Sequence, residues 1–198
     1  MIIMQEVKTI HVILEFLGHP LVVSIVTIAI GSYFIDKLNK KREKREKKID
    51  GAVGLAEDIS NALNSDLTNL FLQVRSQNFV LLPSFINASL DAFKNRLKFK
   101  IRIKTYYNEE VLFNDYNKII REISSIKQSI ERYPKDPISE NKFIEDRISA
   151  LESEWNIHDY KIEDLKAPFH LYFSWAQILW LKAERYSSEI YTKSIDVK

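Results

Sequence analysis

Residues 20–35 read PLVVSIVTIAIGSYFI, an almost uninterrupted apolar run, and residues 37–48 read KLNKKREKREKK. At about 1.5 Å per residue, the apolar run makes about 24 Å of helix, against a hydrocarbon core of about 30 Å. Leu38 extends the apolar stripe, and Lys37 can reach the headgroups with its amine, so the shortfall is tolerable. We therefore predict a transmembrane helix over residues 20–38. A run this short is also compatible with a buried core helix of a soluble protein.

The charged segment after the apolar run sets the expected orientation. A secretory signal peptide carries its positive charge before the apolar run, and here the order is reversed. By the positive-inside rule, the C-terminal side is expected in the cytoplasm, in a single-pass protein of the cell inner membrane that contacts membrane lipid. Residues 39–50 are expected to continue as a basic juxtamembrane helix. The basic membrane collar consists of Lys37, Lys40, Lys41, Arg42, Lys44, Arg45, Lys47 and Lys48, interrupted by Glu43 and Glu46.

One face of the predicted transmembrane helix carries small and hydroxyl residues. Ser24, Thr27 and Gly31 are spaced three and four residues apart. Residues of this kind at this spacing let helices approach closely in lipid, so they predict packing between transmembrane helices and a homo-oligomer. The alternative is that these residues have no such role, because Ser, Thr and Gly occur in many single-pass helices.

The segment before the apolar run, residues 1–19, has the pattern of an amphipathic helix. Its apolar residues recur at intervals of four and three, and Lys8, His11 and Glu15 lie on another side. Ionisable groups at membrane depth need water or partners, so we expect these three residues to face a lumen or the membrane interface. His19 continues their line, but Gly18 breaks the helix before it, and we expect no metal site.

Composition favours an all-α protein. The chain has 198 residues, only four glycines and long stretches without proline, which argues against a turn-rich β architecture. It has no cysteine, so it can form neither a disulfide nor a thiolate metal site. The formal net charge is only +2, so the strongly basic signal is local to the collar. We predict that the transmembrane helix continues into a cytoplasmic bundle of about five helices over residues 51–198.

Two long helices are predicted by apolar residues that recur at alternating intervals of four and three, over residues 112–133 and 172–190. Such a seam packs either inside a bundle or against another subunit, and the pattern leaves both possibilities open. Aromatic residues outside the second seam indicate burial on several sides. Between the two helices, we expect a shorter one to start at Ser139. The core or oligomer seam includes Tyr116, Ile119, Ile123, Tyr172, Leu179 and Tyr186.

Residues 97–104, LKFKIRIK, alternate strictly between apolar and basic residues. This is the period of a half-buried strand, but no partner strand is evident, so we expect the preceding helix to extend through the segment. The basic residues form a second cationic patch that could contact the phosphate of RNA or lipid. A solvated helix face is the favoured interpretation. The patch consists of Lys98, Lys100, Arg102 and Lys104.

The spacings assemble no set of residues that carries known chemistry. A Gly-rich phosphate loop, a Ser/His/Asp constellation, a Cys nucleophile and a His/Asp metal cluster are all missing. His158 lies in an acidic and aromatic loop, where a solvent-exposed histidine is the favoured interpretation. We therefore expect no catalytic residue, no cofactor and no metal, and predict that the chain is not an enzyme.

The order of elements resembles the small membrane accessory proteins encoded beside the RNA-guided, RNA-cleaving effector of type VI-B CRISPR systems. The likeness covers the apolar run 20–35, the charged extension 37–48 and a helical domain over residues 51–190, similar to a divergent HEPN bundle. It implies a homo-oligomeric membrane pore that strengthens antiviral defence, with the RNA-guided effector or its RNA as a partner. HEPN ribonucleases carry an Arg and a His in close succession. Here ten residues separate Arg147 from His158, so nuclease activity is not implied.

Three functional hypotheses follow from these observations. The first is an oligomeric membrane pore or permeabilising protein, built on the short transmembrane helix and the ionisable segment before it. The second is a single-pass anchor whose bundle binds a cytoplasmic partner. The third is a membrane-tethered RNA-binding protein that uses the basic patch at residues 98–104, and no binding of DNA is expected.

Overall fold

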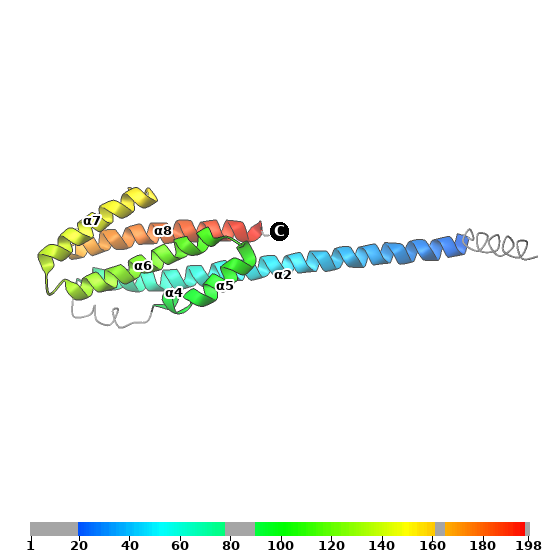
Figure 1. Ribbon diagram of the computed structural model, residues 1–198, viewed down its shortest axis with the longest axis horizontal. Coiled ribbons are helices and arrows are strands. Elements are labelled where there is room, and N and C mark those ends of the chain that lie inside the picture. Colours follow the sequence, from blue (N-terminus) through cyan, green and yellow to red (C-terminus); the bar gives the residue numbers. More distant parts are fainter. Residues whose placement is uncertain (1–19, 78–89, 161–164, 197–198) are drawn as a thin grey trace, which may run out of the picture. The chain divides into compact units, whose positions relative to one another are not determined.

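The chain is helical in every regular element that its structure describes, a computed structural model covering residues 20–77, 90–160 and 165–196. The predicted all-α class is therefore confirmed for these residues (Figure 1). The chain forms two compact units, Met1–Lys47 and Lys48–Lys198. The helices are α2 (Pro20–Arg75), α4 (Asp91–Lys94), α5 (Arg96–Tyr107), α6 (Glu110–Arg132), α7 (Pro137–Trp155) and α8 (Phe169–Ile195).

Helix α2 begins at Pro20, where a proline loses no hydrogen bond because the first turn of a helix has no acceptor for its nitrogen. The helix is unbroken through Gly51 and Gly54. A Cβ atom on Gly51 would overlap the hydroxyl oxygen of Tyr106, so the glycine permits this close approach of α5. From Ala52 onward, the apolar stripe of α2 is buried in the second unit: Ala52, Leu55, Ala56, Ile59, Leu63, Leu67, Leu70 and Val74.

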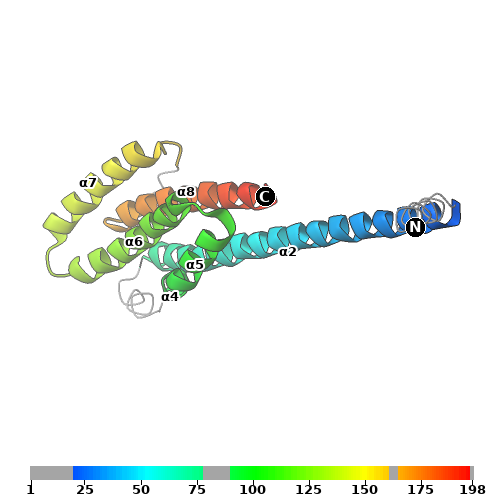
Figure 2. The same ribbon diagram turned by 45° about the vertical axis from the view of Figure 1, so that its right-hand side comes forward.

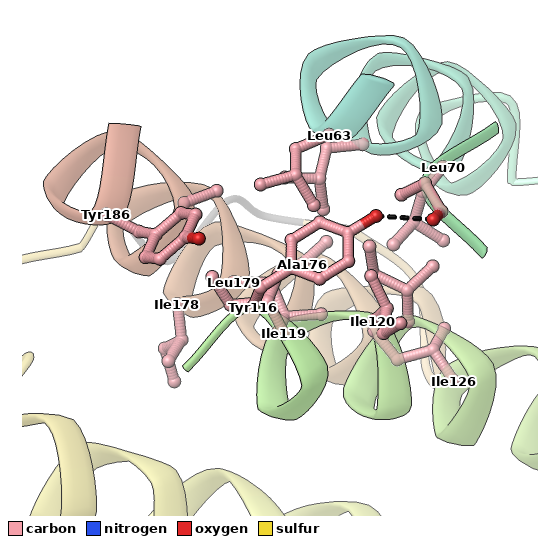
Figure 3. Close-up of a cluster of buried hydrophobic side chains, with 14 of the residues drawn as sticks. Leu63, Leu70, Tyr116, Ile119, Ile120, Ile126, Ala176, Ile178, Leu179 and Tyr186 are labelled. Carbon is pink, nitrogen blue, oxygen red and sulfur yellow. Dashed lines mark hydrogen bonds between the residues drawn. The ribbon is translucent and has the colours of Figure 1, made fainter. Parts of the chain in front are cut away.

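The core of the second unit is formed largely by α2, α6 and α8. Helices α6 and α8 run side by side in both views (Figures 1 and 2). The predicted seams of α6 and α8 are buried in this core, with Tyr133 at the end of α6 only partly buried. Figure 3 shows buried side chains from the three helices: Leu63 and Leu70 of α2, Tyr116, Ile119, Ile120 and Ile126 of α6, and Ala176, Ile178, Leu179 and Tyr186 of α8.

Residues 97–104 lie within helix α5, so the helical interpretation of the alternating segment is confirmed. The expected single helix is divided, because a short α4 ends at Lys94 and α5 begins at Arg96. The side chains of Phe99 and Ile103 are buried in the core, whereas those of Leu97 and Ile101 are exposed. Leu97 and Ile101 therefore lie on the face of α5 that points away from the core.

Helix α7 begins two residues before the predicted start at Ser139. The Asp136 carboxylate accepts a hydrogen bond from the backbone N–H of Ser139 at 3.1 Å, and Pro137 occupies the first helical position. A carboxylate that caps a helix accepts a hydrogen bond from an N–H group that would otherwise lack an acceptor. Its negative charge also interacts favourably with the positive end of the helix dipole. Asp136, and not Ser139, is therefore the capping residue.

Polar contacts between distant segments fix the ends of the bundle helices. The hydroxyl of Tyr107 donates to the backbone oxygen of Ala52 at 3.0 Å and lies 2.5 Å from the hydroxyl of Ser194. Elsewhere, the buried Asp66 carboxylate of α2 accepts hydrogen bonds from the backbone N–H groups of Asp91 at 3.0 Å and Ala92 at 2.9 Å. These contacts hold both ends of the α4–α5 segment against α2.

Candidate membrane-spanning segment

The apolar segment of α2, residues 20–38, is exposed in the structure. Among the described residues, α2 is the one helix long and apolar enough to cross a membrane, and 0% of its apolar window is buried. A core helix of a soluble protein would be covered by its neighbours, so the exposed window argues against that alternative. The exposed large apolar side chains are Val23, Ile25, Val26, Ile28, Ile30, Tyr33, Phe34, Ile35 and Leu38.

The hydroxyl groups in this segment of α2 are satisfied within the helix itself. Ser24 donates to the backbone oxygen of Pro20 at 2.7 Å, and Thr27 donates to that of Val23 at 2.8 Å. A hydroxyl with an intrahelical acceptor can face hydrocarbon without an unpaired donor. Apart from Gly31 itself, its chain neighbours and the nearby backbone of its own helix, the structure has no atom within 4 Å of the position that a Cβ on Gly31 would take, so this face has room for a neighbour.

The predicted collar is helical throughout and lies in α2. Two of its basic residues form ion pairs with acidic residues four positions away: Lys40 with Asp36 at 2.7 Å, and Arg42 with Glu46 at 2.8 Å. Asp36 raises the pKa of the Lys40 ammonium through its hydrogen bond and its negative charge. The side chains of Lys37, Lys41, Lys44, Arg45 and Lys47 are exposed, and Lys48 is partly buried. The collar therefore retains a dense positive charge.

Lys8, His11 and Glu15, the predicted lumen or interface residues, lie outside the described residues. Their assignment to an amphipathic segment stays a prediction.

The basic patch of α5 is partly neutralised by α2. Asp58 forms an ion pair with Arg102 and lies 3.9 Å from the amine of Lys98. The amine of Lys100 lies 5.3 Å from the centre of the Phe113 ring, a cation–π contact, and Lys104 is exposed. Contact of these residues with phosphate stays a prediction. The guanidinium of Arg102 is already paired with the Asp58 carboxylate.

The seam residues are placed in the core of the chain itself. Tyr116, Ile119, Ile123, Tyr172 and Leu179 have no exposed surface. Tyr186, from the same seam, is 1% exposed. Burial raises the pKa of the Tyr116, Tyr172 and Tyr186 hydroxyls. Side chains buried to this degree within one chain do not form a surface for a second subunit, so we assign the seam to the core.

Arg147 serves the fold. Its guanidinium donates to the Glu122 carboxylate through Nε at 2.9 Å and also through Nη2, and Glu122 is only 6% exposed. The hydrogen bond to Glu122 raises the pKa of Arg147. His158 is exposed. In the described part of the chain, no three His, Cys, Asp or Glu residues gather in a way that would hold a metal ion.

The structure reveals two surface features that the sequence patterns did not indicate. A pocket of about 580 Å³ lies between α2 and α8, and the side chains of Phe71, Phe173 and Trp180 line it. Phe173 and Trp180 belong to the aromatic residues outside the α8 seam, which were the sequence signal for this pocket, whereas Phe71 of α2 had no such signal. The second feature is the outer face of α4 and α5, where Phe93, Leu97 and Ile101 are exposed. Its signal was the alternating pattern of residues 97–104.

No protein-family model, curated protein or solved structure matches this chain.

Proposed function

We propose that the chain is a homo-oligomeric membrane protein that permeabilises the membrane it crosses. The observation that carries this proposal is the apolar segment of α2, residues 20–38, in which the large apolar side chains from Val23 to Leu38 are exposed. Exposed apolar surface of this extent is costly in water and favourable in lipid. The basic collar at the end of this segment supports an orientation with the bundle in the cytoplasm and the span in the cell inner membrane.

Self-association is supported by the face that carries Ser24, Thr27 and Gly31. Transmembrane helices associate where small residues let their backbones approach, because lipid supplies no hydrophobic force between them. The empty space around Gly31 is compatible with such an approach. Permeabilisation then requires several copies, since one short helix encloses no path for water.

The likeness in layout to the type VI-B accessory proteins extends this proposal to antiviral defence. Under this proposal the bundle is HEPN-like, an RNA-guided effector or its RNA is the partner, and the chain is not an enzyme. Arg147 is in accord with the last point, because its guanidinium is paired with the carboxylate of the buried Glu122.

A single-pass anchor whose bundle binds a partner is the second candidate. The intrahelical hydrogen bonds of Ser24 and Thr27 favour it, because hydroxyls satisfied in this way need no neighbouring helix. In this case α2 crosses the membrane as a monomer, and the function of the chain lies in the binding of a partner by the bundle.

Two matched variants separate these candidates. Gly31→Leu fills the face that carries Ser24 and Thr27 with a bulky side chain, whereas Ala29→Leu adds a similar side chain on the opposite side of the helix. The mass of the detergent-solubilised full chain and its leakage of dye from liposomes are measured for each. A permeabilising oligomer predicts that Gly31→Leu lowers both the mass and the leakage, and that Ala29→Leu leaves them near the wild-type values.

The anchor hypothesis predicts a monomeric wild-type chain that inserts without leakage. A wild-type chain of this kind would contradict the pore, and so would equal behaviour of the two leucine variants. Failure of the wild-type chain to insert into liposomes would contradict both candidates.

A further inference from the structure

The alternating pattern of α5 gives this helix two opposite apolar faces. At about 100° per residue, positions four apart lie about 40° from each other, and positions two apart lie about 200° from each other. Leu97 and Ile101 therefore share one face, and Phe99 and Ile103 share the other. Phe99 and Ile103 are 2% and 0% exposed, respectively, whereas Leu97 and Ile101 are 69% and 59% exposed. One apolar face thus has no partner among residues 20–77, 90–160 and 165–196, which the structure describes.

Basic residues surround the unpartnered face. In the same helical projection, Lys98 lies on one side of Leu97 and Ile101, and Lys100 lies on the other. Lys104 follows one turn after Ile101, and Lys94 precedes the face on α4. All four of these lysines are exposed. An exposed apolar stripe flanked by lysines on both sides is typical of a helix that lies in the interface of an anionic bilayer.

The charge of this face remains positive after its ion pairs are counted. Lys94 pairs with Asp91 at 3.2 Å, and Asp58 serves both Lys98 and Arg102. The segment from Lys94 to Lys104 carries six basic residues and no acidic residue. Two carboxylates therefore face six cations, and the surface retains an excess of positive charge that favours an anionic partner.

A pocket of about 350 Å³ opens on this face, between α4, α5 and the start of α6. The guanidinium of Arg96 and the amine of Lys100 both lie over the Phe113 ring, at 6.0 and 5.3 Å from its centre. The guanidinium of Arg96 is also held by Asn117 at 2.6 Å. Cations therefore gather at an apolar hollow beside the exposed stripe. Its lining residues are Phe93, Lys94, Arg96, Leu97, Lys100 and Phe113.

We infer that the outer face of α4 and α5 is a second membrane contact, which inserts Phe93, Leu97 and Ile101 among lipid chains and binds anionic lipid headgroups through the surrounding lysines. Two of the three exposed apolar side chains of this face, Leu97 and Ile101, are aliphatic, and Phe93 alone would offer an exposed ring to a base. Successive aromatic rings for base stacking are typical of a site for single-stranded RNA, so this face favours lipid. The inference rests on the proposed membrane function, because the apolar segment of α2 would bring the bundle to a bilayer. Asp58, which contacts α5, lies about 30 Å of helix beyond Leu38, so the second contact requires α2 to bend after the collar.

The absence of cysteine from the chain allows a direct test. Single cysteines are introduced by Leu97→Cys, Ile138→Cys and Ile25→Cys, and each is labelled with a fluorophore in the full chain. Ile138 is the matched control, because it is 86% exposed and lies on α7, away from this face. Quenching by lipid-borne nitroxide is measured in nanodiscs of phosphatidylcholine alone, and of phosphatidylcholine with phosphatidylglycerol.

In the anionic nanodiscs, the probe at position 97 is expected to be quenched about twofold more than the probe at position 138, since interfacial helices bury their apolar face ~5–10 Å deep. The excess should shrink in neutral nanodiscs. It should also shrink in anionic ones when Lys98, Lys100 and Lys104 become Gln, but not when the exposed Lys135, Lys142 and Lys166 do. The probe at position 25 should be quenched in both kinds of nanodisc.

Equal quenching at positions 97 and 138 in anionic nanodiscs would overturn the inference. If position 25 is quenched while position 97 is not, the second contact alone fails. If position 25 is not quenched, the proposed membrane span fails as well. If the probe at position 97 is protected from a water-soluble quencher in neutral nanodiscs, but is not quenched by the lipid-borne nitroxide, the face would be assigned to a second copy of the chain. Shielding only upon addition of single-stranded RNA would assign it to RNA.

Discussion

Asp66 is the residue at which burial and charge conflict most directly. Its carboxylate is 4% exposed and accepts two backbone hydrogen bonds from the start of α4. Burial raises the pKa of this carboxyl, and the charge of Asp91 adds to the rise, while the two hydrogen bonds and the charge of Lys127 oppose it. The pKa of Asp66 therefore lies above its ordinary value of 3.8. This means that the ionised form is less favourable in the folded state than in the unfolded state.

We therefore expect Asp66 to make the stability of the bundle depend on pH. A carboxyl whose pKa is raised by folding contributes stability below its unfolded pKa and loses it as the pH rises through the folded pKa. Asp66→Asn should abolish this decline above pH 3.8. It should also lower the free energy of unfolding by about 1 kcal/mol, because an amide has one acceptor oxygen for two N–H donors. Denaturant unfolding at several pH values checks this, with Asp159→Asn as the exposed control.

The two helical glycines of the second unit give a matched pair of residue-scale variants. Gly54 has open space at its Cβ position, so Gly54→Ala should raise the free energy of unfolding by about 0.5–1 kcal/mol through helix propensity. Gly51→Ala brings a methyl group against the hydroxyl of Tyr106, which must move. Its gain should be smaller than that of Gly54→Ala, or negative. Thermal unfolding of the two variants provides the comparison, and equal gains would contradict the close approach of Tyr106.

At the scale of elements, the ion pair between Arg147 and Glu122 joins α7 to α6. Glu122 is buried, so removal of its partner leaves an uncompensated charge in the core. Arg147→Ala should therefore lower the free energy of unfolding by about 3 kcal/mol, measured by denaturant titration. The exposed Arg121 precedes Glu122 on α6, and Arg121→Ala should change the stability by less than about 0.5 kcal/mol. A loss as small for Arg147→Ala would show that the pair does not hold the two helices.

Helices whose apolar residues repeat regularly were predictable from the sequence. The seams of α6 and α8 follow the period of a helix packed along one face, and their residues are buried as that period requires. The division at Asn95 and the contact of Asp66 with α4 were not predictable, since both depend on residues distant in the sequence. Residues 97–104 were harder to interpret, because a period of two is typical of a strand. Within a helix, the same period creates two apolar faces.

The candidate site was predictable in part for the same reason. Uniform apolarity over residues 20–35 indicated a membrane helix directly, and the helix is exposed there. The intrahelical hydrogen bonds of Ser24 and Thr27 could not be predicted, because a hydroxyl at these positions can point to its own backbone or to a neighbouring helix. The role of Arg147 depends on a partner 25 residues away in the sequence, which no local spacing indicates.

At the scale of the whole molecule, the collar should decide the orientation of the chain in the membrane. Changing its eight basic residues to Gln removes the asymmetry of positive charge on which the positive-inside rule depends. A cysteine introduced by Ser153→Cys, on an exposed face of α7, serves as the labelling site in the bundle. We expect a membrane-impermeant maleimide that is added from outside to leave this cysteine unlabelled in the wild-type background. The variant should be labelled in a substantial fraction of molecules.

The matched control for the collar is the change of Lys98, Lys100 and Lys104 to Gln. It removes positive charge from α5 and leaves the charge beside the span unchanged, so it should not alter the fraction that is labelled. Labelling of the wild-type bundle from outside would contradict the expected orientation, whatever the variants do.

The contact between the hydroxyl of Ser194 and the backbone oxygen of Ala52, at 3.2 Å, joins residues that are 142 positions apart in the chain. At about 5–20 residues per second, a ribosome needs roughly 7–28 s to make the intervening segment. The apolar segment of α2 therefore leaves the ribosome long before the last helix can complete the bundle. Under the proposed function, the span meets the targeting machinery while the bundle is still unfinished, and the bundle matures on a chain already committed to the membrane.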